Sequence, residues 1–150
     1  MSIFNAMNAS SSALTAQRLR MDTVSSNLAN AQSTRARVNE DGEMEPYRRK
    51  LVEMRPQQES FSSVLSRATD RQNNVQGVEA SGITEDPEPF KLEYNPMHPD
   101  ADEEGYVQIP NVDPLKEMVD LMGATRSYEA NVTALNANKN ILMKALEIGR

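Results

Sequence analysis

The chain has 150 residues, of which 38% are hydrophobic and only 5% aromatic, and it contains no cysteine and a single histidine. This composition excludes disulfides, thiolate metal sites and cysteine nucleophiles, and it disfavours a histidine-based catalytic or metal centre. The net charge of −6 argues against binding the phosphate backbone of nucleic acids. No apolar run approaches the roughly 20 residues of a membrane span, and no cleavable secretion signal is visible. We therefore expect neither an enzyme nor a cofactor-binding protein, and no membrane insertion.

The composition is uneven along the chain. All eight prolines lie between Pro46 and Pro114, and five of the seven aromatic residues lie in the same stretch. Residues 33–112 carry nine basic and sixteen acidic side chains, a net charge of −7, whereas residues 1–32 carry +1 and residues 113–150 are neutral. We expect two helical ends around an acidic middle that prolines divide into short elements.

The N-terminal end has the spacing of a long amphipathic helix. It contains neither glycine nor proline before Gly42, and Met7, Leu14, Met21 and Leu28 recur every seven residues. Phe4, Ser11, Arg18 and Ser25 lie three residues before them, which gives the three-four alternation of a helix that packs along a seam, although this second set is polar after Phe4. This pattern predicts a helix over residues 2–32. Its apolar positions are Phe4, Met7, Leu14, Met21, Val24 and Leu28.

The C-terminal end has the same spacing and a clear starting signal. Asp113 is an N-cap acceptor and Pro114 follows it at the first helical position, so we expect a helix over residues 114–148. The stripe is wider than one partner helix would cover. It follows Met118, Leu121, Thr125, Tyr128, Val132, Leu135, Lys139, Leu142 and Leu146, with an additional apolar edge at Leu115, Met122 and Met143.

Both stripes run over four to five heptads, which is long for helices of a 150-residue globule. Amphipathic helices often just cover a core, but these seams are narrow and interrupted by polar residues. We infer that the two ends pair in an antiparallel or staggered, coiled-coil-like layer and that the remaining apolar edge contacts other subunits. The expected assembly interface is Phe4, Met7, Leu14, Met21, Val24, Leu28, Met118, Leu121, Met122, Tyr128, Val132, Leu135, Leu142 and Leu146.

The middle predicts short strands and turns, which makes the expected fold class α+β. Residues 1–33 and 113–150 would form a discontinuous helical assembly domain, and residues 34–112 a β-rich outer domain. Asp41-Gly42 is a turn signal, and the polar stretch 67–76 reads as a loop. Strands are expected within 47–54, 60–65, 77–84, 90–94 and 106–109.

Two charged patterns are interpreted as structural. Asp100, Asp102 and Glu104 match the first half of a calcium loop, but the twelfth position is Asn111, so we favour an acidic turn. The basic cluster Arg48-Arg49-Lys50 is interleaved with acidic neighbours, so we interpret it as a solvated strand face rather than a nucleic-acid patch. His98 reads as a solvated loop residue.

Three sequence blocks resemble bacterial flagellar rod and hook proteins. Residues 25–30, Ser-Ser-Asn-Leu-Ala-Asn, followed by Ser33-Thr34, are similar to their N-terminal signature, with serine at the usual threonine position. Thr34-Arg35 and the block 95–112 resemble the C-type branch of proximal rod proteins, and residues 117–131 resemble the C-terminal helix of axial proteins. The matching motif residues are Asn27, Leu28, Ala29, Asn30, Thr34, His98, Pro99, Asp100, Asp102, Gly105, Tyr106, Pro110, Asn111, Arg126, Tyr128 and Asn131.

The resemblance implies a structural subunit of the proximal rod that polymerises helically and transmits torque. Its terminal helices would surround a central export channel and its middle would face outward. The implied partners are copies of itself, other rod and basal-body proteins, and the flagellar type III export apparatus, which would export it uncleaved to the basal body. For Asn27 and Asn30, polar contacts and helix termination remain equal alternatives.

Two other interpretations remain open at this point. The chain could be a different axial component, either a rod or a hook protein. It could also be a small binding module in which the helices only dimerise and the β-rich domain captures a ligand.

Overall fold

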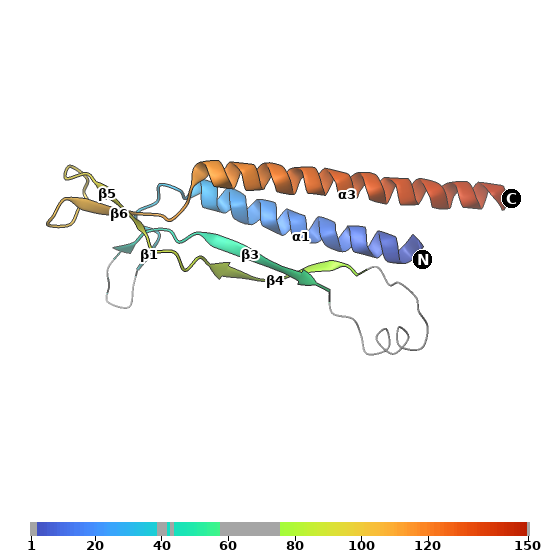
Figure 1. Cartoon of the computed structure of the whole chain (residues 1–150), viewed down its shortest axis with the longest axis horizontal. Helices are drawn as coiled ribbons and strands as arrows, with labels where there is room; N and C mark the ends of the chain where they lie inside the picture. Colours follow the sequence, from blue (N-terminus) through green and yellow to red (C-terminus); the bar gives the residue numbers. More distant parts are fainter. Residues whose placement is uncertain (1–2, 39–41, 43, 58–75, 150) are drawn as a thin grey trace.

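A computed structural model describes residues 3–38, 42, 44–57 and 76–149. Along the chain, one long helix comes before the short strands and another comes after them, which agrees with the expected α+β class (Figure 1). The helices are α1 (Ile3–Ala29) and α3 (Pro114–Ile148). The strands are β1 (Arg37–Val38), β2 (Met44–Glu45), β3 (Lys50–Pro56), β4 (Val78–Glu85), β5 (Lys91–Tyr94) and β6 (Tyr106–Ile109).

The two helices lie side by side and antiparallel, so the start of α1 and the end of α3 lie at the same end of the molecule (Figure 1). This confirms the predicted pairing of the two ends. The Asp113 side chain accepts hydrogen bonds from the backbone N–H of Leu115 at 3.0 Å and of Lys116 at 3.5 Å. The predicted cap therefore starts α3 where expected, with Pro114 in its first turn.

The face that α3 turns inward differs from the predicted stripe at Met118, Thr125, Lys139 and Leu146, which are exposed. The large apolar residues Leu121, Tyr128, Leu135 and Leu142 are half-buried, as expected. Between them, however, Glu117 and Ala124 are buried and Asn131 and Asn138 are half-buried. Small and polar residues occupy these positions because they allow α1 to approach closely, whereas the neighbouring Met118, Thr125 and Lys139 are exposed.

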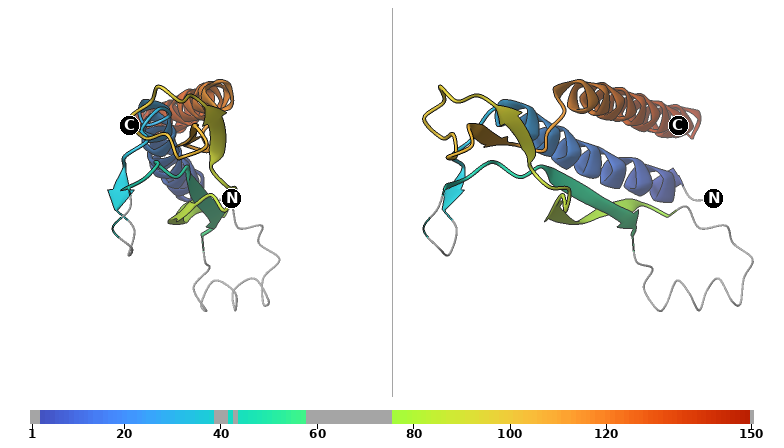
Figure 2. Two further views of the ribbon diagram at one scale, coloured as in Figure 1. Left: turned by 90° about the vertical axis from the view of Figure 1, so that its left-hand side faces the viewer. Right: turned by 60° about the vertical axis from the view of Figure 1, so that its left-hand side comes forward.

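The strands form three separate antiparallel pairs, β1–β2, β3–β4 and β5–β6. The β3–β4 hairpin runs along α1 on the side away from α3. The β5–β6 hairpin lies beyond the other end of the helix pair, where α1 ends and α3 begins (Figures 1 and 2). Gly42, with φ +82°, lies between β1 and β2 at the predicted turn. Four of the predicted strands agree with β3, β4, β5 and β6 to within a few residues.

Some expectations lie outside the described residues. These are the strand expected within 60–65 and most of the loop expected over 67–76. The proposed division into a helical domain and an outer domain stays a prediction, and the contacts of β3 and β4 with α1 connect the two parts closely.

The core is small. The buried hydrophobic residues of the described chain are Ala16, Val24, Tyr47, Val107, Val112 and Ala124. Large hydrophobic side chains elsewhere are exposed, including Phe4 at 66% and Leu146 at 77%. Among the described helices, none is long and apolar enough to cross a membrane.

Candidate functional site

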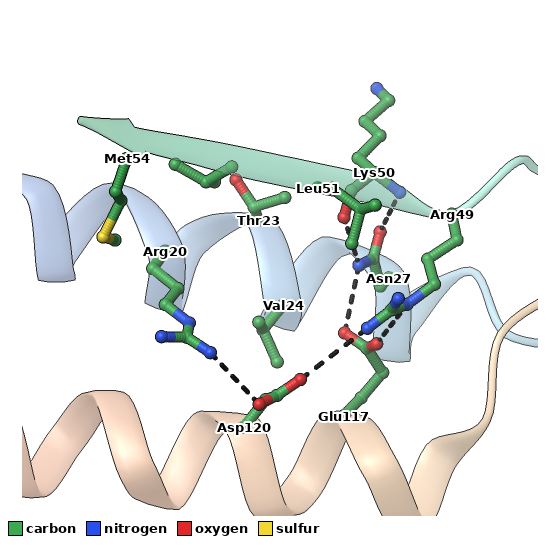
Figure 3. A pocket seen from close by; sticks show the side chains of 11 residues that line it. Arg20, Thr23, Val24, Asn27, Arg49, Lys50, Leu51, Met54, Glu117 and Asp120 are labelled. Atoms are coloured by element: carbon green, nitrogen blue, oxygen red, sulfur yellow. Dashed lines mark hydrogen bonds and ion pairs between the residues drawn. The ribbon is translucent and has the colours of Figure 1, made fainter. Parts of the chain in front are cut away.

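A cluster of buried polar side chains joins both helices to the β3–β4 hairpin, and we call it the polar junction (Figure 3). Its members come from α1, from the segment leading into β3, from the residue after β4, from the segment between β6 and α3, and from the first turns of α3. They are Asn27, Tyr47, Arg49, Asp86, Asn111, Glu117 and Asp120.

Asn27 uses both ends of its side-chain amide. Its Nδ2 donates to the carbonyl of Lys50 at 2.8 Å and to Oε2 of Glu117 at 3.0 Å. Its Oδ1 accepts from the backbone N–H of Lys50 at 2.9 Å and from the hydroxyl of Tyr47 at 3.0 Å. The amide thus pairs with the Lys50 peptide as a neighbouring strand would, and it attaches β3 to α1. Asn27 is only 1% exposed, so satisfying all these groups matters for stability.

Arg49 is the central cation of the polar junction. Its Nε donates to Oε1 of Glu117 at 2.7 Å, and a terminal nitrogen donates to Asp86 at 3.1 Å. A third carboxylate, Asp120, lies 3.7 Å away and also accepts from Arg20 of α1 at 3.1 Å. Glu117 is fully buried, so its charge depends on Arg49 and Asn27 for compensation.

The charges of the polar junction reinforce each other. Burial disfavours the charged guanidinium of Arg49, but hydrogen bonds from it to Glu117 and then Asp86 outweigh that effect and raise its pKa. The backbone N–H of Glu88, and then Arg49, lower the pKa of Asp86 below its ordinary value despite burial. Both groups therefore stay ionised at neutral pH.

Asn111 closes the polar junction on the side of β6. Its Oδ1 accepts from the backbone N–H of Arg49 at 2.9 Å, and its Nδ2 donates to the carbonyl of Glu88 at 3.1 Å. Asn111 thereby joins the chain entering α3 to the segments on either side of the β3–β4 hairpin. Pro110 and Val112 beside it are also buried.

A second contact, which we call the Asp100 clamp, joins the segment after α1 to the loop between β5 and β6. Asp100 accepts from the hydroxyl of Thr34 at 2.9 Å and from two nitrogens of Arg35, with the Nε contact at 2.6 Å. These hydrogen bonds, the one from Arg35 first, lower the pKa of Asp100 and raise that of Arg35. The half-buried His98 accepts the Asp100 backbone N–H at 3.1 Å through Nδ1.

The acidic pattern after Asp100 forms a turn, in line with the favoured interpretation. Asp102 Oδ1 accepts from the backbone N–H of Glu104 at 3.0 Å and of Tyr106 at 2.7 Å. Gly105 has φ +84°, a conformation that L side chains rarely adopt. The described residues contain no group of three or more histidine, aspartate or glutamate side chains arranged to hold a metal ion.

The structure brings some of the predicted residues together and separates others. Thr34, His98 and Asp100 meet in the Asp100 clamp, and Asn27 and Asn111 in the polar junction. Of the remaining motif residues, Pro110 and Gly105 are buried, and Leu28 and Tyr128 are half-buried. Asn131 donates to the carbonyl of Ser127 in its own helix, and Arg126 is exposed.

For the two motif asparagines, the sequence left polar contacts and helix termination as alternatives, and the structure assigns one to each residue. Asn27 makes polar contacts with other elements, whereas Asn30 lies in the turn that ends α1. There its side chain donates to the carbonyl of Ser26 at 2.9 Å, and its own carbonyl accepts from Ser33.

The expected assembly residues also divide into two groups. Val24 is buried, and Met7, Leu14, Met21, Leu28, Leu121, Tyr128, Val132, Leu135 and Leu142 are half-buried. Phe4, Met118, Met122 and Leu146 are exposed, so within a single chain they are not part of the packed seam. Whether they contact other subunits remains a prediction.

The sequence analysis missed the ionic part of the polar junction. Interpreting Arg48-Arg49-Lys50 as a solvated strand face was wrong for Arg49, whose side chain is only 10% exposed. The interpretation fits Lys50, which is exposed, but not Arg48, which is half-buried with its guanidinium carbon 4.6 Å from the centroid of the Phe90 ring. Glu117 and Asp86 were not selected either. A carboxylate in the first turn of a helix has an ordinary explanation in the helix dipole, so no sequence signal distinguished Glu117.

The chain is similar in sequence to known families and proteins. The family described as flagella basal body rod protein matches residues 7–37, and the family described as flagellar basal body rod FlgEFG protein C-terminal matches residues 103–148. The flagellar basal-body rod protein FlgC of Bacillus subtilis is 61% identical over the full length of both chains. The FlgC proteins of Borreliella burgdorferi and Salmonella typhimurium are 40% and 39% identical, over at least 98% of each chain.

This chain belongs to the FlgC family of flagellar basal-body rod proteins. The resemblance inferred from the sequence blocks is thereby confirmed. The two matched segments of this FlgC-family chain contain α1 with Thr34, and β6 with α3. These two matched segments meet where Asn27 contacts Glu117, so the polar junction connects them in space.

Proposed function

We propose that this chain is a structural subunit of the flagellar proximal rod and that it assembles helically into a shaft that transmits torque. The role is structural rather than catalytic. The observation that carries the proposal is the apolar surface that α3 leaves uncovered. Eight large hydrophobic side chains of this helix are exposed, namely Leu115, Met118, Val119, Met122, Ile141, Met143, Leu146 and Ile148.

Four of these residues form a stripe on the first half of α3. Leu115, Met118, Val119 and Met122 are spaced by three, one and three residues, so they lie on one side of the helix. Full burial of a side chain of this size contributes about 1.5–3 kcal/mol. Contacts between neighbouring subunits therefore supply apolar burial that the small core of a single chain does not provide.

The polar junction supports the same role in a different way. A shaft that transmits torque requires each subunit to keep the relative position of its elements under load. Arg49 and Asn27 hold α1, α3 and the β3–β4 hairpin together with directional contacts. Such contacts resist sliding better than apolar packing, which has no preferred direction.

The family relation supports basal-body partners for this chain. We propose other copies of itself and other rod proteins as partners, and the flagellar type III apparatus as its route of export without cleavage. Nucleic acid and membrane insertion have no place in this proposal. A different axial component is less favoured, because the full-length relatives named above are all FlgC proteins.

Complementation of a strain made non-motile by deletion of its own FlgC tests the proposal, with the wild-type chain expected to restore swimming. Val119→Asp with Met122→Asp is expected to abolish swimming in soft agar while the purified variant melts at the wild-type temperature. Thr133→Asp is the matched control, because this α3 residue is also exposed but polar. The double variant changes no buried contact, so its failure to swim would reflect assembly. Normal swimming of the double variant would contradict the role of this surface.

A further inference from the structure

The outer face of the β5–β6 hairpin carries exposed aromatic and aliphatic side chains. Leu92 pairs with Gln108 and Tyr94 with Tyr106, so these residues share one face, whereas Val107 on the other face is 2% exposed. Leu92, Tyr94, Met97 and Tyr106 are 65%, 66%, 94% and 40% exposed. We call these four residues the hairpin patch. Exposed apolar groups gathered in this way indicate a contact surface for another protein.

Acidic residues lie close to the hairpin patch along the chain. Asp102, Glu103 and Glu104 are all exposed in the loop before β6, whereas Glu93 of β5 pairs with Val107 and lies on the other face. The partner surface should therefore combine apolar side chains with positive charge.

The far end of α3 has these properties. α3 continues past the start of α1, and every residue from Met143 to Gly149 is exposed (Figure 1). Its apolar side chains are Ile141, Met143, Leu146 and Ile148, which we call the helix tip. Lys144 is ion-paired with Glu147 at 2.7 Å, so the net charge of +1 over residues 139–149 comes from Lys139.

We infer that the helix tip of one copy docks on the hairpin patch of the next copy, an inference that rests on the proposed function. The two surfaces lie at opposite ends of the elongated chain, so one copy cannot satisfy both by itself (Figures 1 and 2). A contact between two different surfaces repeats in one direction and does not close into a dimer. Head-to-tail docking would thus give the assembly its polarity.

The stripe on the first half of α3 is a weaker candidate for receiving the helix tip. Glu117 and Asp120 beside it are engaged by Arg49 and Arg20, which leaves Asp113 and Lys116 with opposite charges at its edge. This surface has no net charge to select a basic partner. Charge complementarity therefore favours the hairpin patch.

Cysteine cross-linking tests the docking, because the chain contains no cysteine of its own. The full chain with Leu92→Cys and Leu146→Cys would be produced in a strain lacking its own FlgC, and basal bodies would be isolated and mildly oxidised. Non-reducing electrophoresis should show a ladder of dimers and larger oligomers. Both positions are well exposed, so these substitutions leave the core unchanged.

Matched variants separate the possible arrangements. Leu92→Cys with Thr133→Cys should give no ladder, and the two single variants produced together should stop at a dimer. Glu103→Lys with Glu104→Lys should reduce the ladder, and Lys139→Glu with Lys144→Glu should restore it. Homodimers of Leu146→Cys alone, cross-links only to other proteins, or no cross-link in basal bodies that contain the chain would overturn the docking. Absence of the chain from basal bodies would instead overturn the proposed function on which it rests.

Discussion

Asn27 and Glu117 are separated by 90 residues in the chain, and the Asn27 Nδ2 donates to the buried Glu117 Oε2 at 3.0 Å. This one contact joins the end of the first helix to the beginning of the last. It also places the Asn27 amide so that it pairs with the Lys50 peptide. Two stability predictions follow directly from this contact.

Asn27→Ala should lower the free energy of unfolding by about 2–3 kcal/mol, because it removes the side-chain partner of the Lys50 backbone N–H and C=O groups and one of the two partners of the buried Glu117. Urea unfolding followed by circular dichroism measures the change. Asn8→Ala is the control, since Asn8 is an exposed residue of the same helix. Equal effects of the two substitutions would show that the Asn27 contacts do not stabilise the fold.

Glu117→Ala should lower the free energy of unfolding by about 3 kcal/mol, because it leaves the buried Arg49 guanidinium without its shortest ion pair. Glu117→Gln keeps a hydrogen-bond acceptor and should cost less. Glu129→Ala removes an exposed glutamate from the same helix and should change stability by less than about 0.5 kcal/mol. A Glu117→Ala protein as stable as Glu129→Ala would contradict the central role of the ion pair.

Asp100→Asn should destabilise the protein at neutral pH but not in acid. Because Arg35 and Thr34 lower the pKa of Asp100 in the folded state, their stabilisation is complete above about pH 4 and is lost as the pH falls through that lower pKa. The melting temperatures of wild type and variant should therefore differ at pH 7 and converge as the pH falls below the lowered folded-state pKa of Asp100. Asp22→Asn makes the same charge change at an exposed position of α1 and should show no such convergence. A difference between wild type and Asp100→Asn that stays constant with pH would rule out an ionic clamp.

The sequence predicted the helices better than their contacts. The Asp113-Pro114 signal and the three-four spacing place α3 correctly, since capping and periodicity are local properties. The same periodicity placed Met118 in the seam instead of Glu117, because it selects hydrophobic residues. Close helix contact instead selects residues that are small or can be paired inside, such as Ala124.

The ionic contacts could not be predicted from the sequence for a related reason. Arg49 resembles any strand arginine among acidic neighbours, and its partner Glu117 lies 68 residues away. Only the folded arrangement shows that this pair is shielded from water. The motif blocks nevertheless pointed to several of the right positions, because Asn27, Asn111 and Asp100 all make contacts between distant segments.

Gly105→Ala and Gly123→Ala should have opposite effects on stability. At Gly105 the backbone is left-handed, with φ +84°, and a Cβ would lie 3.0 Å from Tyr94 Cε2 and 3.2 Å from Pro96 Cβ. The substitution should cost about 1–2 kcal/mol from backbone strain alone, and it should disturb the Tyr94–Tyr106 ring contact. Gly123 lies inside α3 with no atom within 4 Å of a new Cβ, so alanine there should stabilise the protein by about 1 kcal/mol. Thermal melts of both variants provide the measurement, and a Gly105→Ala protein that melts at or above the wild-type temperature would show that the turn does not require glycine.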